Sequence, residues 1–143
     1  MANTVKHDNR GSMNELTENV IGAAIAVHKT LGPGLLESAY DECLAHEMTL
    51  RGLKFERQVS LPVNYRGVRL DCGYRVDFLI GHALVLELKA VHAIEPIHEA
   101  QLLTYLKLGN WPVGLLINFN VRLLKNGVRR MVLNYDETST VER

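Results

Sequence analysis

The chain has 143 residues, of which 47% are hydrophobic and 22% are charged, and its formal net charge is zero with the histidines neutral. This composition is typical of a soluble globular protein. The length fits one domain and leaves little room for a second. Because no apolar run approaches the roughly 20 residues needed to cross a bilayer, we exclude a membrane-spanning helix and expect no membrane partner.

The ends of the chain carry little structural signal. Residues 1–12 lack hydrophobic periodicity, so we interpret them as a disordered leader or a tag remnant. We expect a single domain over residues 13–135 and a flexible tail over 136–143. The two cysteines, Cys43 and Cys72, have no metal-binding spacing, which favours a reduced, cytoplasmic setting.

Two helices are predicted first. Apolar residues recur at helical spacing from Asn14 to Leu31, and Gly32-Pro33-Gly34 then breaks the helix. A second helix is expected from Leu36 to Arg51, with Gly52 as its stop.

The apolar period changes to two at Phe55, which indicates strands. We predict a strand to Tyr65 with an edge or bulge at Pro62, a long strand from Val68 to Ile80, and a third from Leu84 to Ala90.

One more helix and one or two strands complete the pattern. The helix is expected over Ile97–Leu108, followed by a buried strand over Val113–Phe119. Asn126-Gly127 is a hairpin signal before a final strand near Arg129–Leu133. The predicted fold is therefore α/β, a mixed sheet flanked by helices in the order α-α-β-β-β-α-β-β.

The register of the central hairpin follows from burial. A three-residue loop, 81–83, gives the hairpin one apolar face, on which Ile80 lies opposite Leu84, Phe78 opposite Leu86, and Val76 opposite Leu88. The other face then places Asp77 opposite Glu87 and Arg75 opposite Lys89. A two-residue loop would bury the acids among aliphatic side chains, at a large cost in free energy.

Two carboxylates in this register repel each other unless a cation neutralises them, because their Cβ atoms are only about 4.5–5.5 Å apart. Mg²⁺ or Mn²⁺ would suit these oxygen ligands, and Lys89 would orient or help deprotonate an attacking water. The alternative is an exposed sheet face on which Arg75 and Lys89 are salt-bridge partners. The apolar residues around Glu87 and Lys89 favour the metal site over this alternative.

Two further groups of side chains are candidates for binding. His98, Gln101 and Tyr105 share one face of their predicted helix and could hold a phosphate or a metal-bound water; a solvated helix face is the alternative. Arg57, Arg66 and Arg75 lie in basic stretches that could contact a nucleic-acid backbone; solvated surface is again the alternative.

Asp77, followed by Glu87-Leu88-Lys89 and a helix that carries Gln101, resembles the core of the PD-(D/E)XK nucleases. The segment from Gly34 to Tyr40 resembles the motif of the GxxExxY protein family within that superfamily, and the likeness runs from about Met13 to Leu133. The resemblance implies that Glu37, Asp77 and Glu87 bind the metal. It also implies catalytic roles for Lys89, Gln101 and Glu37.

Two positions depart from the family pattern. Relatives often carry Glu where this chain has Ala26, which would weaken the site if that Glu assists metal binding, and Val76 replaces the proline before Asp77. His28 is a secondary candidate whose alternative role is a hydrogen-bonded core histidine, and His98 and Tyr105 are secondary candidates too.

We therefore expect a Mg²⁺- or Mn²⁺-dependent phosphodiester hydrolase, a nuclease whose partner is nucleic acid and in the first place DNA. Two alternatives stay open. One is a nucleic-acid-binding module that has the fold without turnover. The other is a protein-interaction subunit, such as a homodimer, for which the near-neutral charge is suitable.

Overall fold

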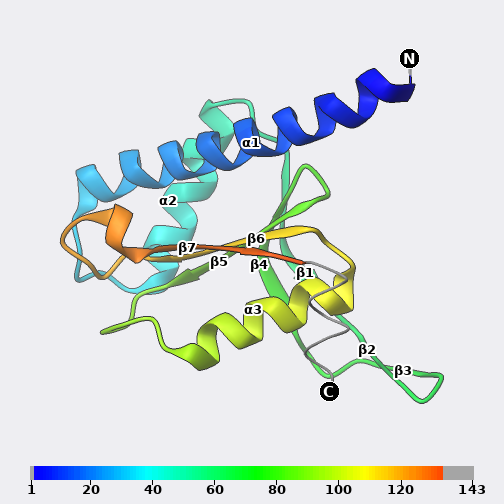
Figure 1. Cartoon of the computed structure of the whole chain (residues 1–143). Helices are drawn as coiled ribbons and strands as arrows, with labels where there is room; N and C mark the ends of the chain where they lie inside the picture. Colours follow the sequence, from blue (N-terminus) through cyan, green and yellow to red (C-terminus); the bar gives the residue numbers. More distant parts are fainter. Residues whose placement is uncertain (1, 134–143) are drawn as a thin grey trace.

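The computed structural model describes residues 2–133, with side-chain positions from residue 13 onward. Helices α1 (Ala2–Leu31) and α2 (Glu37–Leu50) lie on one face of a central sheet, and α3 (Pro96–Gly109) covers the other (Figure 1). Among the described residues, no helix combines the length and the apolar character needed to cross a membrane.

The central sheet has five strands in the order β1-β4-β5-β6-β7. The strands are β1 (Phe55–Ser60), β4 (Arg75–Ile80), β5 (Leu84–Lys89), β6 (Val113–Asn118) and β7 (Val128–Val132). Strands β5 and β6 are parallel and joined through α3, whereas the other neighbouring pairs are antiparallel. The predicted mixed sheet flanked by helices is therefore confirmed.

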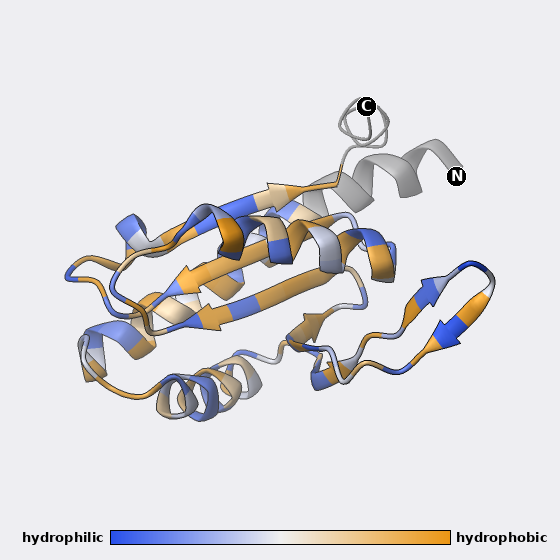
Figure 2. Cartoon of the chain, turned by 90° about the horizontal axis from the view of Figure 1, so that it is seen from below, coloured by the Kyte–Doolittle hydropathy of each residue, from blue (hydrophilic) through white to orange (hydrophobic). Residues whose placement is uncertain are grey.

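Each face of the sheet buries its own apolar cluster. Phe78, Ile80 and Leu86 pack on the side of α1 and α2, whereas Leu79 and Val85 pack with residues of α3. The sheet is apolar along most of its length in Figure 2, as expected when both faces are covered.

Helix α1 begins at Ala2, whereas the sequence pattern predicted a helix only from Asn14 and a disordered leader before it. Once a helix has formed, each added residue gains one hydrogen bond, so it can extend through residues that have no apolar period. At the other end of the chain, the flexible tail predicted for residues 136–143 lies outside the described residues.

Two predicted strands are each interrupted. The chain leaves the sheet after β1, at Leu61-Pro62, and β2 (Val63–Tyr65) and β3 (Val68–Leu70) form a separate two-stranded sheet. Pro62 has no N–H to donate to a ladder, which accounts for the break. This hairpin projects beyond the body of the molecule (Figure 1).

The predicted register of the β4–β5 hairpin is confirmed where the two strands pair. Phe78 pairs with Leu86, Leu79 with Val85 and Ile80 with Leu84, across the expected loop 81–83. The expectation that Val76 faces Leu88 is wrong, because the two side chains belong to clusters on opposite faces. The alternation of β4 is broken at Asp77, beside Gln58 of β1, whose φ is 52°.

Asn126-Gly127, predicted as a hairpin signal, lies in the connection between the antiparallel strands β6 and β7 but forms no tight turn. The residues belong to a 3₁₀ helix, η1 (Leu124–Gly127), within a longer connection between β6 and β7. A Cβ atom at Gly127 would lie 2.2 Å from the carbonyl oxygen of Asn118. The glycine therefore permits a close backbone approach at this position.

Candidate metal centre

A cavity of ≈ 210 Å³ lies between the sheet and α3. The polar side chains that line it are Glu37 of α2, Arg75 and Asp77 of β4, Glu87 and Lys89 of β5, and His98, Gln101 and Tyr105 of α3. The structure therefore brings together the predicted acids, the predicted lysine and the polar face of the predicted helix.

The Asp77 carboxylate is held by the backbone of β5. Its Oδ2 atom accepts a hydrogen bond from the amide of Leu88 at 2.8 Å. The β4–β5 ladder ends at Phe78 and Leu86, so this carboxylate takes the place of a backbone acceptor just beyond the last paired residues. Asp77 is thereby fixed beside the segment that carries Glu87 and Lys89.

Strand β6 holds the other edge of the same segment. Glu87, Leu88 and Lys89 pair in parallel with Leu116, Ile117 and Asn118, and the Phe119 amide donates to the Lys89 carbonyl at 2.9 Å. Because both edges are bonded, the backbone that presents the acid and the lysine is rigid.

Glu87 is the most deeply buried acid in the cavity. It is 8% exposed, and its Oε1 atom has no hydrogen-bond partner among the described residues. Burial, the nearby charge of Asp77 and a hydrogen bond with the Asp77 side chain raise the pKa of Glu87 to about 9, and Lys89 partly opposes this. A buried carboxyl oxygen without a hydrogen bond is costly, so Oε1 is the oxygen of Glu87 that a bound water or cation would stabilise.

Glu37 enters the cavity from the first turn of α2. Gly34, with a φ of 100°, shapes the preceding loop, and the hydroxyl of buried Tyr40 binds its two ends. That hydroxyl donates to the Gly32 carbonyl at 2.6 Å and accepts from the Leu35 amide at 3.1 Å. The Gly34–Tyr40 motif therefore fixes where Glu37 begins the helix.

Partial desolvation raises the pKa of Glu37, and the charge of Asp77 raises it further, whereas Lys89 lowers it. Glu37 thus interacts electrostatically with the same aspartate and lysine that surround Glu87. Its side chain is nevertheless exposed, so it lies at the mouth of the cavity.

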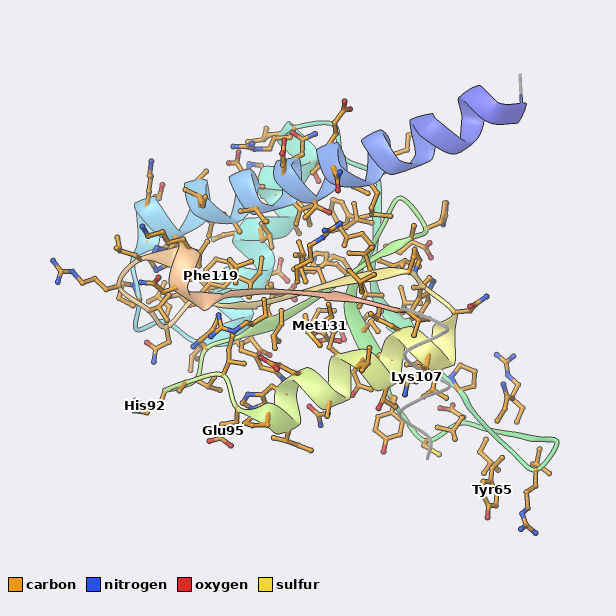
Figure 3. The ribbon with its side chains drawn as sticks, viewed as in Figure 1. Tyr65, His92, Glu95, Lys107, Phe119 and Met131 are labelled. Atoms are coloured by element: carbon orange, nitrogen blue, oxygen red, sulfur yellow. The ribbon has the colours of Figure 1, made fainter. Side chains whose placement is uncertain are left out.

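Helix α3 supplies the polar wall opposite the strands. The His98 Nδ1 atom accepts a hydrogen bond from the Glu95 amide at 3.0 Å. This bond is part of a capping box at the start of α3, where Figure 3 labels Glu95. Desolvation, followed by the charge of Glu87, raises the pKa of Tyr105. Gln101 lies between these two along the helix and is exposed.

The three candidate arginines occupy different places. Arg75 lines the cavity. Arg57 forms ion pairs with Asp41 and Glu42 of α2 and lies over the Phe78 ring. Arg66 lies in the turn between β2 and β3, stacked over Tyr65. Of these three arginines, the structure therefore places only Arg75 in the cavity with Asp77 and Glu87.

His28 is also outside the cavity. It is buried, and its Nε2 atom lies 2.7 Å from the Val121 carbonyl oxygen. This geometry corresponds to the hydrogen-bonded core histidine that was the alternative reading of the sequence.

Two contributors were missed in the sequence. Leu88 was predicted only as an apolar side chain opposite Val76, and Tyr40 only as the last residue of the Gly34–Tyr40 motif, so neither was given a hydrogen-bonding role. Tyr40 lies one helical turn after Glu37, and that spacing was the available signal.

A family model described as the PD-(D/E)XK nuclease superfamily matches residues 14–131. The chain belongs to the PD-(D/E)XK nuclease superfamily. Its five-stranded mixed sheet with helices on both faces is consistent with the restriction-endonuclease-like fold of that superfamily. None of the curated proteins and none of the solved structures that were compared matches the chain.

Membership suggests a metal-dependent nuclease, since nucleases of this superfamily usually use divalent metals. In residues 13–133, no three His, Cys, Asp or Glu side chains stand close enough together to form a complete ligand set. Mg²⁺ does not require one, because one or two carboxylates, waters and substrate phosphate satisfy it. Asp77 and the partnerless Oε1 of Glu87 fit this requirement.

Ala26 does not face this site. It lines a separate cavity between α1 and α2, together with Cys43 and His46. The substitution at this position therefore removes no group from the cavity that holds Asp77 and Glu87.

Proposed function

We propose that the chain is a Mg²⁺- or Mn²⁺-dependent phosphodiesterase that cleaves nucleic acid, with DNA as its first expected substrate. The observation that supports this most strongly is Glu87, a carboxyl group buried beside Asp77 with one oxygen that lacks a partner. Asp77 and Glu87 would hold the metal, and Glu37 would reach it directly or through water.

When bound, the metal supplies a Lewis acid that polarises the scissile phosphate and balances its developing charge. Lys89 lies in the same cavity as both ligands, where its ammonium group orients the attacking water and attracts the phosphate. Gln101 and Tyr105 provide an amide and a hydroxyl on the opposite wall that bind the phosphate oxygens or the water. Arg75 provides a further positive charge for the backbone.

The proposed reaction is a hydrolysis. The water oxygen forms a bond to phosphorus and releases a proton to solvent, while the bond from phosphorus to one ester oxygen breaks. The electron pair leaves with that oxygen, which takes up a proton. The products are a phosphomonoester end and a hydroxyl end.

Assignment to the GxxExxY family within the superfamily is part of the proposal. It is supported by the structural role of its motif, since Gly34 shapes the loop, Tyr40 ties it and Glu37 lines the cavity. A cytoplasmic location, a single domain over residues 13–135 and a homodimer stay predictions.

The test is cleavage of end-labelled DNA and RNA in Mg²⁺ or Mn²⁺ by the purified chain, by Lys89→Met and by Lys107→Met. Lys107 is the matched control, because it is an exposed lysine of α3 that does not line the cavity. We expect Lys89→Met to lose cleavage by about 10²-fold or more and Lys107→Met to retain it. Absence of cleavage by the unmodified chain under every metal and substrate would contradict the proposal.

The second candidate function is nucleic-acid binding without turnover. It is favoured by Arg75 and Lys89, which line the same cavity with two side chains able to bind a phosphate without a metal. It predicts salt-sensitive binding that is equal for the unmodified chain and Lys89→Met, with no cleavage by either.

A further inference from the structure

A second cavity, of ≈ 300 Å³, adjoins the candidate metal centre on the side of the β2–β3 hairpin. Gln101 and Tyr105 line both cavities, so the two are neighbours along one wall of α3. Its volume reaches the lower end of the range typical of small-molecule sites.

The walls of the second cavity are apolar and aromatic. They include Val63 of β2, Ile97 and Leu108 of α3, and the rings of Tyr74 and Tyr105. No charged residue of the described chain lines it. An uncharged, flat occupant therefore suits this cavity, in contrast with the ionic cavity beside it.

Tyr74 is held in place while part of its surface stays free. Its backbone carbonyl accepts a hydrogen bond from the Leu61 amide at 2.8 Å, where the chain leaves and re-enters the sheet. Its ring centroid lies 6.0 Å from that of Tyr105, and the ring planes are inclined at 52°. The residue is 45% exposed and Ile97 is 59% exposed, so ring and aliphatic surface are available for stacking.

Polar groups at the margin of the cavity can form hydrogen bonds with the edge of a flat ligand. Thr104 and Gln101 line the cavity with a hydroxyl and an amide, which both donate and accept hydrogen bonds. Aromatic surface flanked by such groups is how proteins bind bases of single-stranded nucleic acid.

We propose that this cavity binds an unpaired nucleobase, from a nucleotide next to the phosphate held in the metal centre. The inference rests on the proposed function, and continuity between the two cavities through Gln101 and Tyr105 supports it. A base paired inside a duplex cannot stack on Tyr74 unless it is flipped out. The preferred substrate class is therefore single-stranded nucleic acid, or an unpaired end, flap or loop.

The test combines base removal with removal of the tyrosine ring. Binding of a labelled single strand is measured by anisotropy in EDTA, with an abasic position moved one nucleotide at a time. The proteins are the unmodified chain, Tyr74→Ala, Tyr74→Phe and Tyr65→Ala. Tyr65 is a control because it is an exposed aromatic residue of the β2–β3 hairpin, labelled in Figure 3, and lines neither cavity.

We expect Tyr74→Ala to weaken single-strand binding roughly 5- to 150-fold, the effect of losing one stacked base. Tyr74→Phe keeps the ring and is expected to bind like the unmodified chain, as is Tyr65→Ala. One abasic position should weaken binding to the unmodified chain but have no added effect in Tyr74→Ala. Ile97→Ser alters an exposed side chain of the same cavity and should weaken single-strand binding as well. This second variant keeps the test valid if Tyr74→Ala does not fold.

Binding without metal separates this inference from the proposed function. Coupling of Tyr74 to one base, with no cleavage in any metal, would support the base site and overturn the nuclease proposal. Metal-dependent cleavage with equal affinity for single strands and duplexes, and no position sensitive to base removal, would overturn the base site alone. A change of oligomeric state in Tyr74→Ala and Ile97→Ser, with unchanged DNA binding, would overturn it in favour of a second protein copy.

Discussion

The Asp77 carboxylate accepts a hydrogen bond from the Leu88 amide at 2.8 Å, just past the point where β4 and β5 stop pairing. One side chain thus both completes the backbone bonding of β5 and stands beside Glu87. The structural role of Asp77 and its proposed metal-binding role therefore fall on one side chain, and the two can be separated by the choice of substitution.

Asp77→Asn and Asp77→Ala should differ in stability but not in metal binding. The asparagine oxygen can still accept from the Leu88 amide, whereas alanine leaves a buried donor unpaired at a cost of about 1–3 kcal/mol. Both remove the charged ligand, so both should lose Mn²⁺ binding. Urea denaturation and titration calorimetry measure the two quantities. Equal stability of the two variants would show that the Asp77–Leu88 hydrogen bond contributes nothing to the free energy of unfolding.

The metal-free protein should lose stability as the pH rises from about 4.5 toward 9. The folded-state pKa of Glu87, about 9, exceeds its ordinary value of 4.5, so the folded state holds more protons than the unfolded state in this window. The free energy of unfolding therefore falls with rising pH, and Glu87→Gln should flatten that dependence. Denaturation in EDTA at several pH values tests this.

The same proton must leave before Glu87 binds a cation, so Mn²⁺ affinity should increase as the pH approaches 9. Glu18→Gln, at an exposed position of α1, is the matched control and should leave both pH dependences unchanged. Identical pH slopes for the unmodified chain and Glu87→Gln would contradict the assignment of the raised pKa.

Arg75 and Arg57 should affect different properties. Arg75→Ala removes a cation from the cavity and should reduce the salt dependence of nucleic-acid binding by about 0.7–0.9 in the log–log slope, the value for one phosphate. Arg57→Ala breaks ion pairs with Asp41 and Glu42 and should lower thermal stability slightly, without changing that slope. An equal change of slope in both variants would restore Arg57 as a phosphate contact. The part played by Arg66 stays a prediction.

Tyr40→Phe should reduce activity through Glu37 although Tyr40 does not line the cavity. Phenylalanine keeps the ring stacked on Phe119, at 4.6 Å between centroids, but loses the hydroxyl that ties Gly32 to Leu35. We expect a loss of about 1–3 kcal/mol in stability and a lower kcat with substrate binding little changed. Cleavage kinetics and denaturation measure this, and unchanged kcat in a destabilised variant would limit the tyrosine to folding.

Much of the fold could be predicted because burial leaves few choices. The loop 81–83 follows from the need to place Phe78 and Ile80 on one face, and the three pairs that form have that register. Helix α3 agrees with its prediction within a residue at each end, since its apolar side is buried as Leu102 and Leu106.

The errors occur where local geometry overrides a repeating pattern. The alternation that predicted one long strand to Ile80 does not show that residues 71–74 leave the strand, or that β4 changes face at Asp77. Arg57 looked like a free cation because its partners, Asp41 and Glu42, belong to a distant part of the sequence. Such long-range pairings depend on the folded arrangement of α2 against β1.

The central claim is that Asp77 and Glu87 bind one divalent cation together, and the most direct measurement is anomalous diffraction from a crystal soaked in Mn²⁺. The account predicts one anomalous peak in contact with both carboxylates, at about 2.0–2.6 Å from their oxygens, and no peak in Glu87→Gln. A saturating soak that leaves both carboxylates without a peak, with Glu87 Oε1 bonded to another protein group, would contradict it.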